Sequence, residues 1–113
     1  MSYNVLIKVY GHVWPISKDV KKKLSPYFIA NEHMSAEEML EYENDMLRIS
    51  FEGIYLDIEE VLTILKCYLQ ATSQGKVDYI DLEAWTLTRS SIKNGLISTS
   101  SASLNAVMDY SGH

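Results

Sequence analysis

The stretch IEEVLTILKCYLQA, residues 58–71, constrains the fold more than any other part of the chain. Its apolar side chains recur at helical spacing and fall on a single stripe, which comprises Ile58, Val61, Leu62, Leu65, Tyr68 and Leu69. Asp57 stands immediately before the stretch, and aspartate is a preferred helix N-cap. Because such a stripe must be buried against another element, the pattern predicts a main amphipathic helix that packs on the rest of the fold.

The surface that receives this helix is predicted to be a β-sheet. LRISFEG, residues 47–53, alternates apolar and polar side chains, which is typical of a strand with one buried and one solvated face. YNVLIKVY, residues 3–10, has the same period but carries apolar residues on both faces, so we expect an internal strand. Residues 76–92 scatter their apolar side chains around a helical wheel, and their threonine and aromatic content suits a strand better.

The dipeptide Asn94–Gly95 predicts a tight hairpin turn, because both residues of such a two-residue turn need positive φ. We therefore expect a last strand to begin at Leu96. The serine-rich run STSSAS at 98–103 is typical of a surface loop. The apolar residues within 104–110 recur at helical spacing and predict a short terminal helix.

Two further short helices are predicted between the first two strands. Ser17 precedes a basic segment that Pro26 ends, and Ser35 with Glu38 forms a capping-box pattern that opens a helix at Ala36. That second helix should finish by the END motif at 43–45. The whole pattern predicts an α+β fold: an antiparallel sheet of about four strands, with the 58–71 helix packed on one face and shorter flanking helices.

Length and composition indicate one domain that covers residues 1–113. No apolar stretch approaches the roughly 20 residues that span a bilayer, and the N-terminus lacks the pattern of a secretory signal. The single cysteine, Cys67, excludes an internal disulfide framework and falls on the polar side of the main helix. We therefore predict a cytoplasmic protein that does not enter the membrane.

Charge is concentrated in residues 31–60, which carry ten acidic side chains and one arginine, a net charge of −9 within a total of −5. Such a segment disfavours nucleic acid as a partner, because binding to its phosphates requires basic side chains that displace the counterions. It favours a protein partner with a basic surface. The residues predicted to contact that partner are Glu37, Glu38, Glu41, Glu59 and Glu60.

No residue pattern typical of catalysis or metal binding is complete in this chain. The three histidines, at positions 12, 33 and 113, each stand apart from Cys67 in the sequence. The segment 70–81 resembles a calcium loop only in its glycine and in Asp78 and Asp81, and two carboxylates are too few for the six to eight oxygen ligands of that ion. We therefore predict no catalytic residues, no metal and no cofactor.

Two functions are consistent with these observations. The first is a small non-catalytic interaction or accessory module, of inhibitor or adaptor type, that uses its acidic segment to bind a protein. The alternative is an enzyme or small-ligand-binding protein whose site is assembled from residues distant in the sequence. The sequence leaves self-association into a homo-oligomer open. A deep pocket with converging polar groups would favour the alternative, and an exposed aromatic surface would favour the first.

Overall fold

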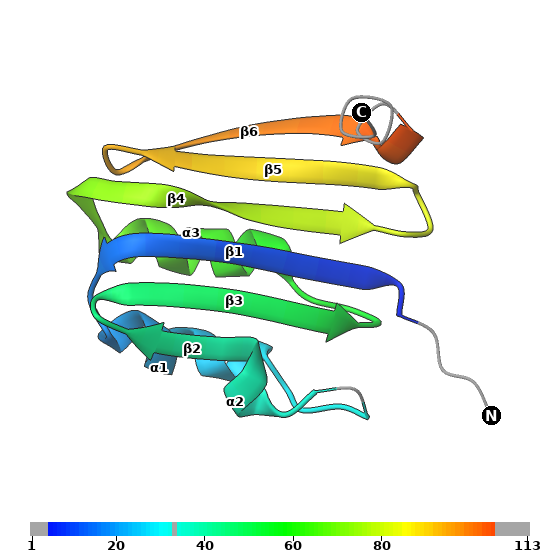
Figure 1. The fold of residues 1–113 in the computed structure, drawn as a ribbon, viewed down its shortest axis with the longest axis horizontal. Helices are drawn as coiled ribbons and strands as arrows, with labels where there is room; N and C mark the ends of the chain where they lie inside the picture. The colour runs from blue at the N-terminus through cyan, green and yellow to red at the C-terminus, as the bar shows by residue number, and fades with distance from the viewer. Residues whose placement is uncertain (1–4, 33, 106–113) are drawn as a thin grey trace.

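A computed structural model describes residues 5–32 and 34–105 of the chain. Within these residues six strands form one antiparallel sheet in the order β2-β3-β1-β4-β5-β6 (Figure 1). The strands are β1 (Ile7–Ile16), β2 (Leu40–Glu43), β3 (Met46–Gly53), β4 (Leu69–Asp81), β5 (Thr86–Lys93) and β6 (Leu96–Ser103). The helices are α1 (Asp19–Leu24), α2 (Ala36–Met39) and α3 (Ile58–Tyr68), with a 3-10 turn, η1 (Ser25–Tyr27), after α1.

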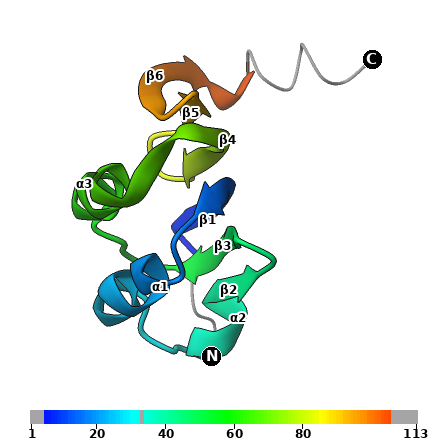
Figure 2. The same ribbon diagram turned by 90° about the vertical axis from the view of Figure 1, so that its left-hand side faces the viewer.

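The core lies between the sheet and one layer of helices. Figure 2 shows α1 and α3 together on one side of the sheet. Val61 and Leu65 of α3 are fully buried, as are Val9 and Val13 of β1 and several further side chains of the sheet and of α1. Burying an aliphatic side chain stabilises a fold by about 1.5–3 kcal/mol, so this single layer accounts for most of the apolar stabilisation.

The prediction of about four strands under one main helix is wrong. Six strands are present in the described residues, and α3 shares the covered face with α1. The helix that was expected from Ala36 ends at Met39 and gives way to β2. It ends there because Asn44 and Asp45 adopt positive φ of 55° and 63°, forming a tight turn that folds β2 back onto β3.

The region after α3 also differs from the prediction. The helix stops at Tyr68, and Leu69 begins β4, a strand of 13 residues that pairs with β1. Gly75 lies inside β4, with a φ of 151°. An added Cβ at Gly75 would contact the carbonyl oxygen of His12, so glycine is needed here because β1 and β4 approach closely.

Two other segments are corrected by the structure. Residues 76–92 do not form one strand, because a turn at 82–85 separates β4 from β5 and places Trp85 at a φ of 60°. The run at 98–103 is not a loop but part of β6, which pairs with β5 along its whole length. Of the predicted terminal helix, residues 106–110 lie outside the described residues, and 104–105 are helical.

Several local predictions are confirmed. The Ser35 hydroxyl accepts from the Glu38 N–H and the Glu38 carboxylate accepts from the Ser35 N–H, which completes the capping box. Asp57 caps α3 by accepting a hydrogen bond from the Glu60 N–H at 3.2 Å. The turn at Asn94 and Gly95 joins β5 to β6 as expected. No helix within the described ranges is long and apolar enough to cross a membrane.

Candidate functional site

The sheet face opposite α1 and α3 is not covered by any other element of the described chain (Figure 2). We call this surface the open face. On β1 the open face comprises every second side chain, because Ile7, Val9 and Val13 between them are buried under the helices. The strand pairing places the following residues on it: Lys8, Tyr10, His12 and Trp14 of β1; Arg48, Ser50 and Glu52 of β3; Gln74, Lys76, Asp78 and Ile80 of β4; Leu87, Arg89 and Ser91 of β5.

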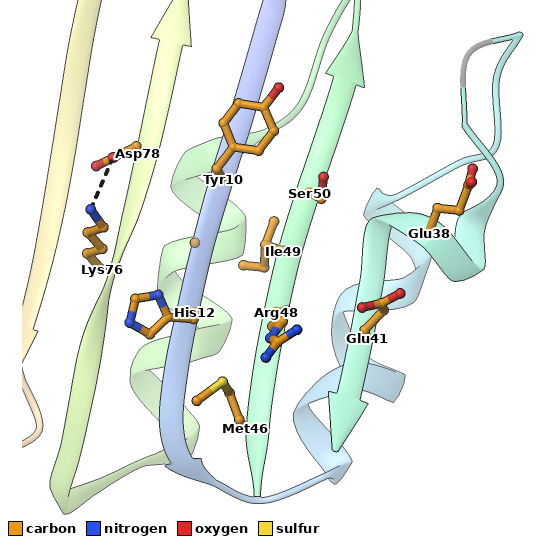
Figure 3. A pocket seen from close by; sticks show the side chains of 11 residues that line it. Tyr10, His12, Glu38, Glu41, Met46, Arg48, Ile49, Ser50, Lys76 and Asp78 are labelled. Atoms are coloured by element: carbon orange, nitrogen blue, oxygen red, sulfur yellow. Dashed lines mark ion pairs between the residues drawn. The ribbon is translucent and has the colours of Figure 1, made fainter. Parts of the chain in front are cut away.

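A depression of about 550 Å³ lies on the open face, over β3, β1 and β4 (Figure 3). Its polar side chains come from five different elements and comprise Tyr10, His12, Glu38, Glu41, Arg48, Ser50, Lys76 and Asp78. A smaller depression of about 230 Å³ shares Glu41, Met46 and Arg48 with the first and extends to Trp14. The two therefore form one concave surface that runs from β4 to the β2 edge.

Three basic side chains form a row across this surface. His12 pairs with Arg48 on one side and with Lys76 on the other, so the three lie on neighbouring strands at one level of the sheet (Figure 3). Arg48 makes no ion pair with any residue in the described part of the chain, whereas Lys76 Nζ lies 3.9 Å from Asp78 Oδ2. Arg48 and Lys76 place two positive charges on either side of His12, so this level of the sheet is suited to an anion.

Asp78 also makes a second, stronger interaction, with Arg89 of β5. Arg89 Nε lies 2.7 Å from Asp78 Oδ1, and Arg89 Nη2 lies 2.9 Å from Asp78 Oδ2. This two-pronged hydrogen bonding raises the pKa of Arg89, with the charge of Asp78 as the second cause. Asp78 therefore acts as a fixed acceptor that orients Arg89 on the open face.

Tyr10 is fixed in a similar way. Its hydroxyl donates to Glu52 Oε2 at 2.5 Å, and Glu52 lies on the neighbouring strand β3. Burial, followed by this hydrogen bond and the charge of Glu52, raises the pKa of Tyr10 to about 12. At neutral pH the phenol is protonated and remains a donor, so Tyr10 presents a rigid, uncharged ring to the open face.

Aromatic exposure is the most unusual property of β1. The side chain of Trp14 is 48% exposed and that of Tyr10 is 36% exposed. The two lie on the same face of the central part of the sheet, on either side of His12. Large aromatic side chains in such a position are typical of surfaces that bind another molecule.

The structure separates the five glutamates that the sequence predicted as partner contacts. Glu38 and Glu41 line the larger depression (Figure 3). Glu37 precedes Glu38 in the first turn of α2. Glu59 and Glu60 lie in the first turn of α3, on the helix-covered side of the sheet. One flat partner surface therefore cannot contact all five.

His12, Trp14 and Arg48 could not be predicted as site residues from local sequence patterns. The pattern that marks them is the two-residue period of β1, continued beyond Tyr10 to Trp14. The predicted strand ends at Tyr10, so His12 and Trp14 are not recognised as residues on the outer face of β1. Arg48 was correctly placed on the outer face of its strand but had no partner in sequence to suggest a role.

Other kinds of site have no support among the described residues. No group of three or more histidine, cysteine, aspartate or glutamate side chains there is placed to hold a metal ion. Cys67 is exposed and belongs to α3, the helix that covers the other face of the sheet. Comparison with known proteins finds no matching family model, no matching curated protein and no matching solved structure. The geometry of the open face is therefore the main indication of function.

Proposed function

We propose that this chain is a non-catalytic interaction module that binds a protein partner through the open face of its sheet. The observation that carries the proposal is the exposure of Trp14 and Tyr10 on the central strand, beside Arg48, whose guanidinium makes no ion pair with any described residue. Tryptophan, tyrosine and arginine are the residues most enriched among those that dominate protein–protein binding energy. Here they meet on one uncovered surface.

Rigidity of the open face supports this proposal. The Tyr10 ring is held by Glu52, and Arg89 is held by Asp78, so both are fixed before a partner arrives. A side chain that is already ordered loses less conformational entropy on binding, and about 0.5–1.5 kcal/mol is saved for each such side chain. The face is therefore suited to recognition without rearrangement.

The charges of the open face define the partner that would fit. Arg48 and Lys76, which lie on either side of His12, would receive a carboxylate of the partner. Glu38 and Glu41 at the β2 edge would face basic side chains of the same partner. A mixed surface of this kind suits a protein better than nucleic acid, whose phosphates would meet these carboxylates.

The acidic segment has a narrower role in this proposal than the sequence suggested. Glu37, Glu38 and Glu41 would steer a partner with a basic surface toward the open face, because they border it. Glu59 and Glu60 would take no part in docking. We also propose a cytoplasmic location, where the exposed thiol of Cys67 would stay reduced.

The test compares partner capture by three versions of the full chain. A Trp14→Ser, Arg48→Glu variant changes the open face, and a Tyr55→Ser variant removes an aromatic ring that is 71% exposed in the loop before α3. A protein captured by the wild type and by Tyr55→Ser, but not by the open-face variant, is then purified and titrated. Loss of a central hot spot of about 2 kcal/mol should weaken its affinity about 30-fold.

Thermal melts of all three versions show whether each remains folded. Equal affinity of a purified partner for the wild type and the open-face variant contradicts the proposal. So does a partner that is lost on Glu59→Gln, Glu60→Gln substitution, because that result places binding on the helix side.

A second candidate function is the binding of a small anionic ligand in the depression. The observation in its favour is that Tyr10, His12, Arg48 and Lys76 converge from three strands that are distant in sequence. Isothermal titration with phosphate and with a dicarboxylate separates the two candidates. Saturable binding that is lost on Arg48→Gln, with no captured protein, favours the ligand-binding function.

A further inference from the structure

The two edges of the sheet are protected very differently against pairing with another strand. The β2 edge has four residues, and two of them, Glu41 and Glu43, are charged. The β6 edge has eight residues, LISTSSAS, with no charge and no proline. Its pairing with β5 runs without a register shift, so no bulge interrupts it. Short length, charge, proline and bulges are the devices that prevent edge pairing, and β6 has none of them.

The free side of β6 carries backbone groups that can accept a strand. The Leu104 N–H donates to the Trp85 carbonyl at 2.9 Å, which continues the β5–β6 ladder. Hydrogen bonding alternates along an antiparallel pair, so even-numbered residues of β6 turn their backbone groups toward β5. Ile97, Thr99 and Ser101 therefore direct theirs outward, where no other strand of the described chain lies.

The side chains of β6 would not obstruct such pairing. Residues 98–103 are all serine, threonine or alanine and all are exposed. The nearest charged residues on the open face, Arg89 and Lys93, are one strand further in, on β5, and Arg89 already pairs with Asp78. Two copies of β6 can therefore approach on the open face without bringing like charges together, and on the helix side the charged residue beside β6 is Lys66 of α3, which lines a hollow with Ile97 and Thr99.

A row of apolar side chains makes β6 complementary to itself. Ile80 pairs with Leu87, and Leu87 pairs with Ala102, so this row crosses the open face and ends at the β6 edge. Leu96 lies at the other end of the same edge, on the same face, and is 75% exposed. A second β6 that runs antiparallel to the first would bring Leu96 next to the end of this row, and the two-fold symmetry would make that contact twice.

We propose that two copies of this chain associate through β6, antiparallel about a two-fold axis at Thr99. Thr99 then faces Thr99 of the partner subunit, and Leu96 faces Ala102 of the partner subunit. The two sheets become one continuous sheet, and the two open faces lie side by side on the same surface. This inference does not depend on the proposed partner binding, because it uses an edge of the sheet and not the depression.

Site-directed crosslinking tests both the association and its register. In a Cys67→Ser background, Thr99→Cys places two thiols directly opposite each other, at a Cα separation of about 5.5 Å that a disulfide can span. Ser103→Cys is the matched control, since it lies on the same exposed strand and the same side of the sheet. At 103 the two thiols would be about 27 Å apart, at about 3.4 Å for each of eight residues.

The expected result is a disulfide-linked dimer for Thr99→Cys and a monomer for Ser103→Cys under the same mild oxidation. Equal crosslinking at both positions indicates random collision and overturns the proposal. Sedimentation of the wild-type chain should show twice the monomer mass of 12.9 kDa as concentration rises into the micromolar range. A wild-type chain that stays monomeric at its highest attainable concentration also overturns it.

Charge substitution supplies an independent control. Thr99→Lys would oppose two ammonium groups at the axis and should return the chain to a monomer, whereas Ser103→Lys should leave the dimer intact. Circular dichroism shows that both variants are folded. Dissociation by both substitutions alike, or β6 pairing only with a different protein, contradicts self-association about Thr99.

Discussion

Ser73 should be among the most sensitive polar positions in the chain. Its side chain is fully buried, and it joins β4 to β1 beside the point where their pairing shifts register. The hydroxyl donates to the Pro15 carbonyl at 2.6 Å and accepts from the Gln70 N–H at 2.9 Å. Ser73→Ala removes a single oxygen, and both backbone groups lose this partner.

The expected loss of unfolding free energy is about 2 kcal/mol. A hydrogen bond contributes about 1 kcal/mol net, and a buried polar group left without a partner costs about 1–3 kcal/mol. The two hydrogen bonds of Ser73 are part-buried, so water reaches the freed backbone groups to some extent. We therefore take about 1 kcal/mol, the lower end of this range, for the loss of each bond. Two such losses give about 2 kcal/mol, a large fraction of the roughly 5–15 kcal/mol typical of a domain.

Urea unfolding followed by tryptophan fluorescence measures this loss, with an unchanged m-value as the sign that the unfolded state is the same. Ser90→Ala is the matched control, because Ser90 is equally buried but its hydroxyl has a single partner, the Thr99 hydroxyl at 3.1 Å. The control should lose about 0.5–1 kcal/mol. The reasoning is refuted if Ser73→Ala costs no more than Ser90→Ala.

Three further predictions concern the backbone, pH and thiol reactivity. Gly75→Ala should cost more than about 3 kcal/mol in the same urea assay, because its Cβ would overlap the His12 carbonyl oxygen and its φ is 151°. Since the pKa of Tyr10 is raised to about 12, its contribution to stability is present below about pH 10 and is lost as pH rises toward 12. Tyr10 is partly exposed, so wild-type stability should fall by only about 1 kcal/mol more than that of Tyr10→Phe over this range, and an equal fall would contradict the assignment. Cys67 should react with a thiol reagent in the native state, because it is exposed, and labelling only after denaturation would show that it is covered.

The elements that the sequence predicts well are those whose signals are local. Asp57 and the apolar stripe define the start and the buried side of α3, and the Asn94–Gly95 pair defines the last turn. The alternation within 47–53 predicts β3 and its buried face correctly. Each of these depends on neighbours within a few residues.

The strand segments that the sequence does not predict depend on pairing with a neighbouring strand and not on a pattern of their own. β2 follows a correctly capped helix start, and only pairing with β3 explains why the helix ends after four residues. The start of β6 at Leu96 is predicted correctly, but its residues 98–103 have the composition of a loop because they lie on an edge strand exposed on both faces, and pairing with β5 makes them part of the strand. The basic row of the site is hidden for the same reason, since Arg48, His12 and Lys76 are brought together by pairing across three strands.

The central position of β1 has a consequence for the order in which the chain can fold. β2 with β3, and β4 with β5 and β6, are joined by short turns, so each set closes small loops and forms early. β1 joins the two sets, but its pairing partners are distant in the sequence, because Ile7 pairs with Gly53 on one side and with Asp81 on the other. These long loop closures make the insertion of β1 the late step. Until it occurs, β3 and β4 each present a free edge, and this is the interval in which the folding chain is most exposed to aggregation.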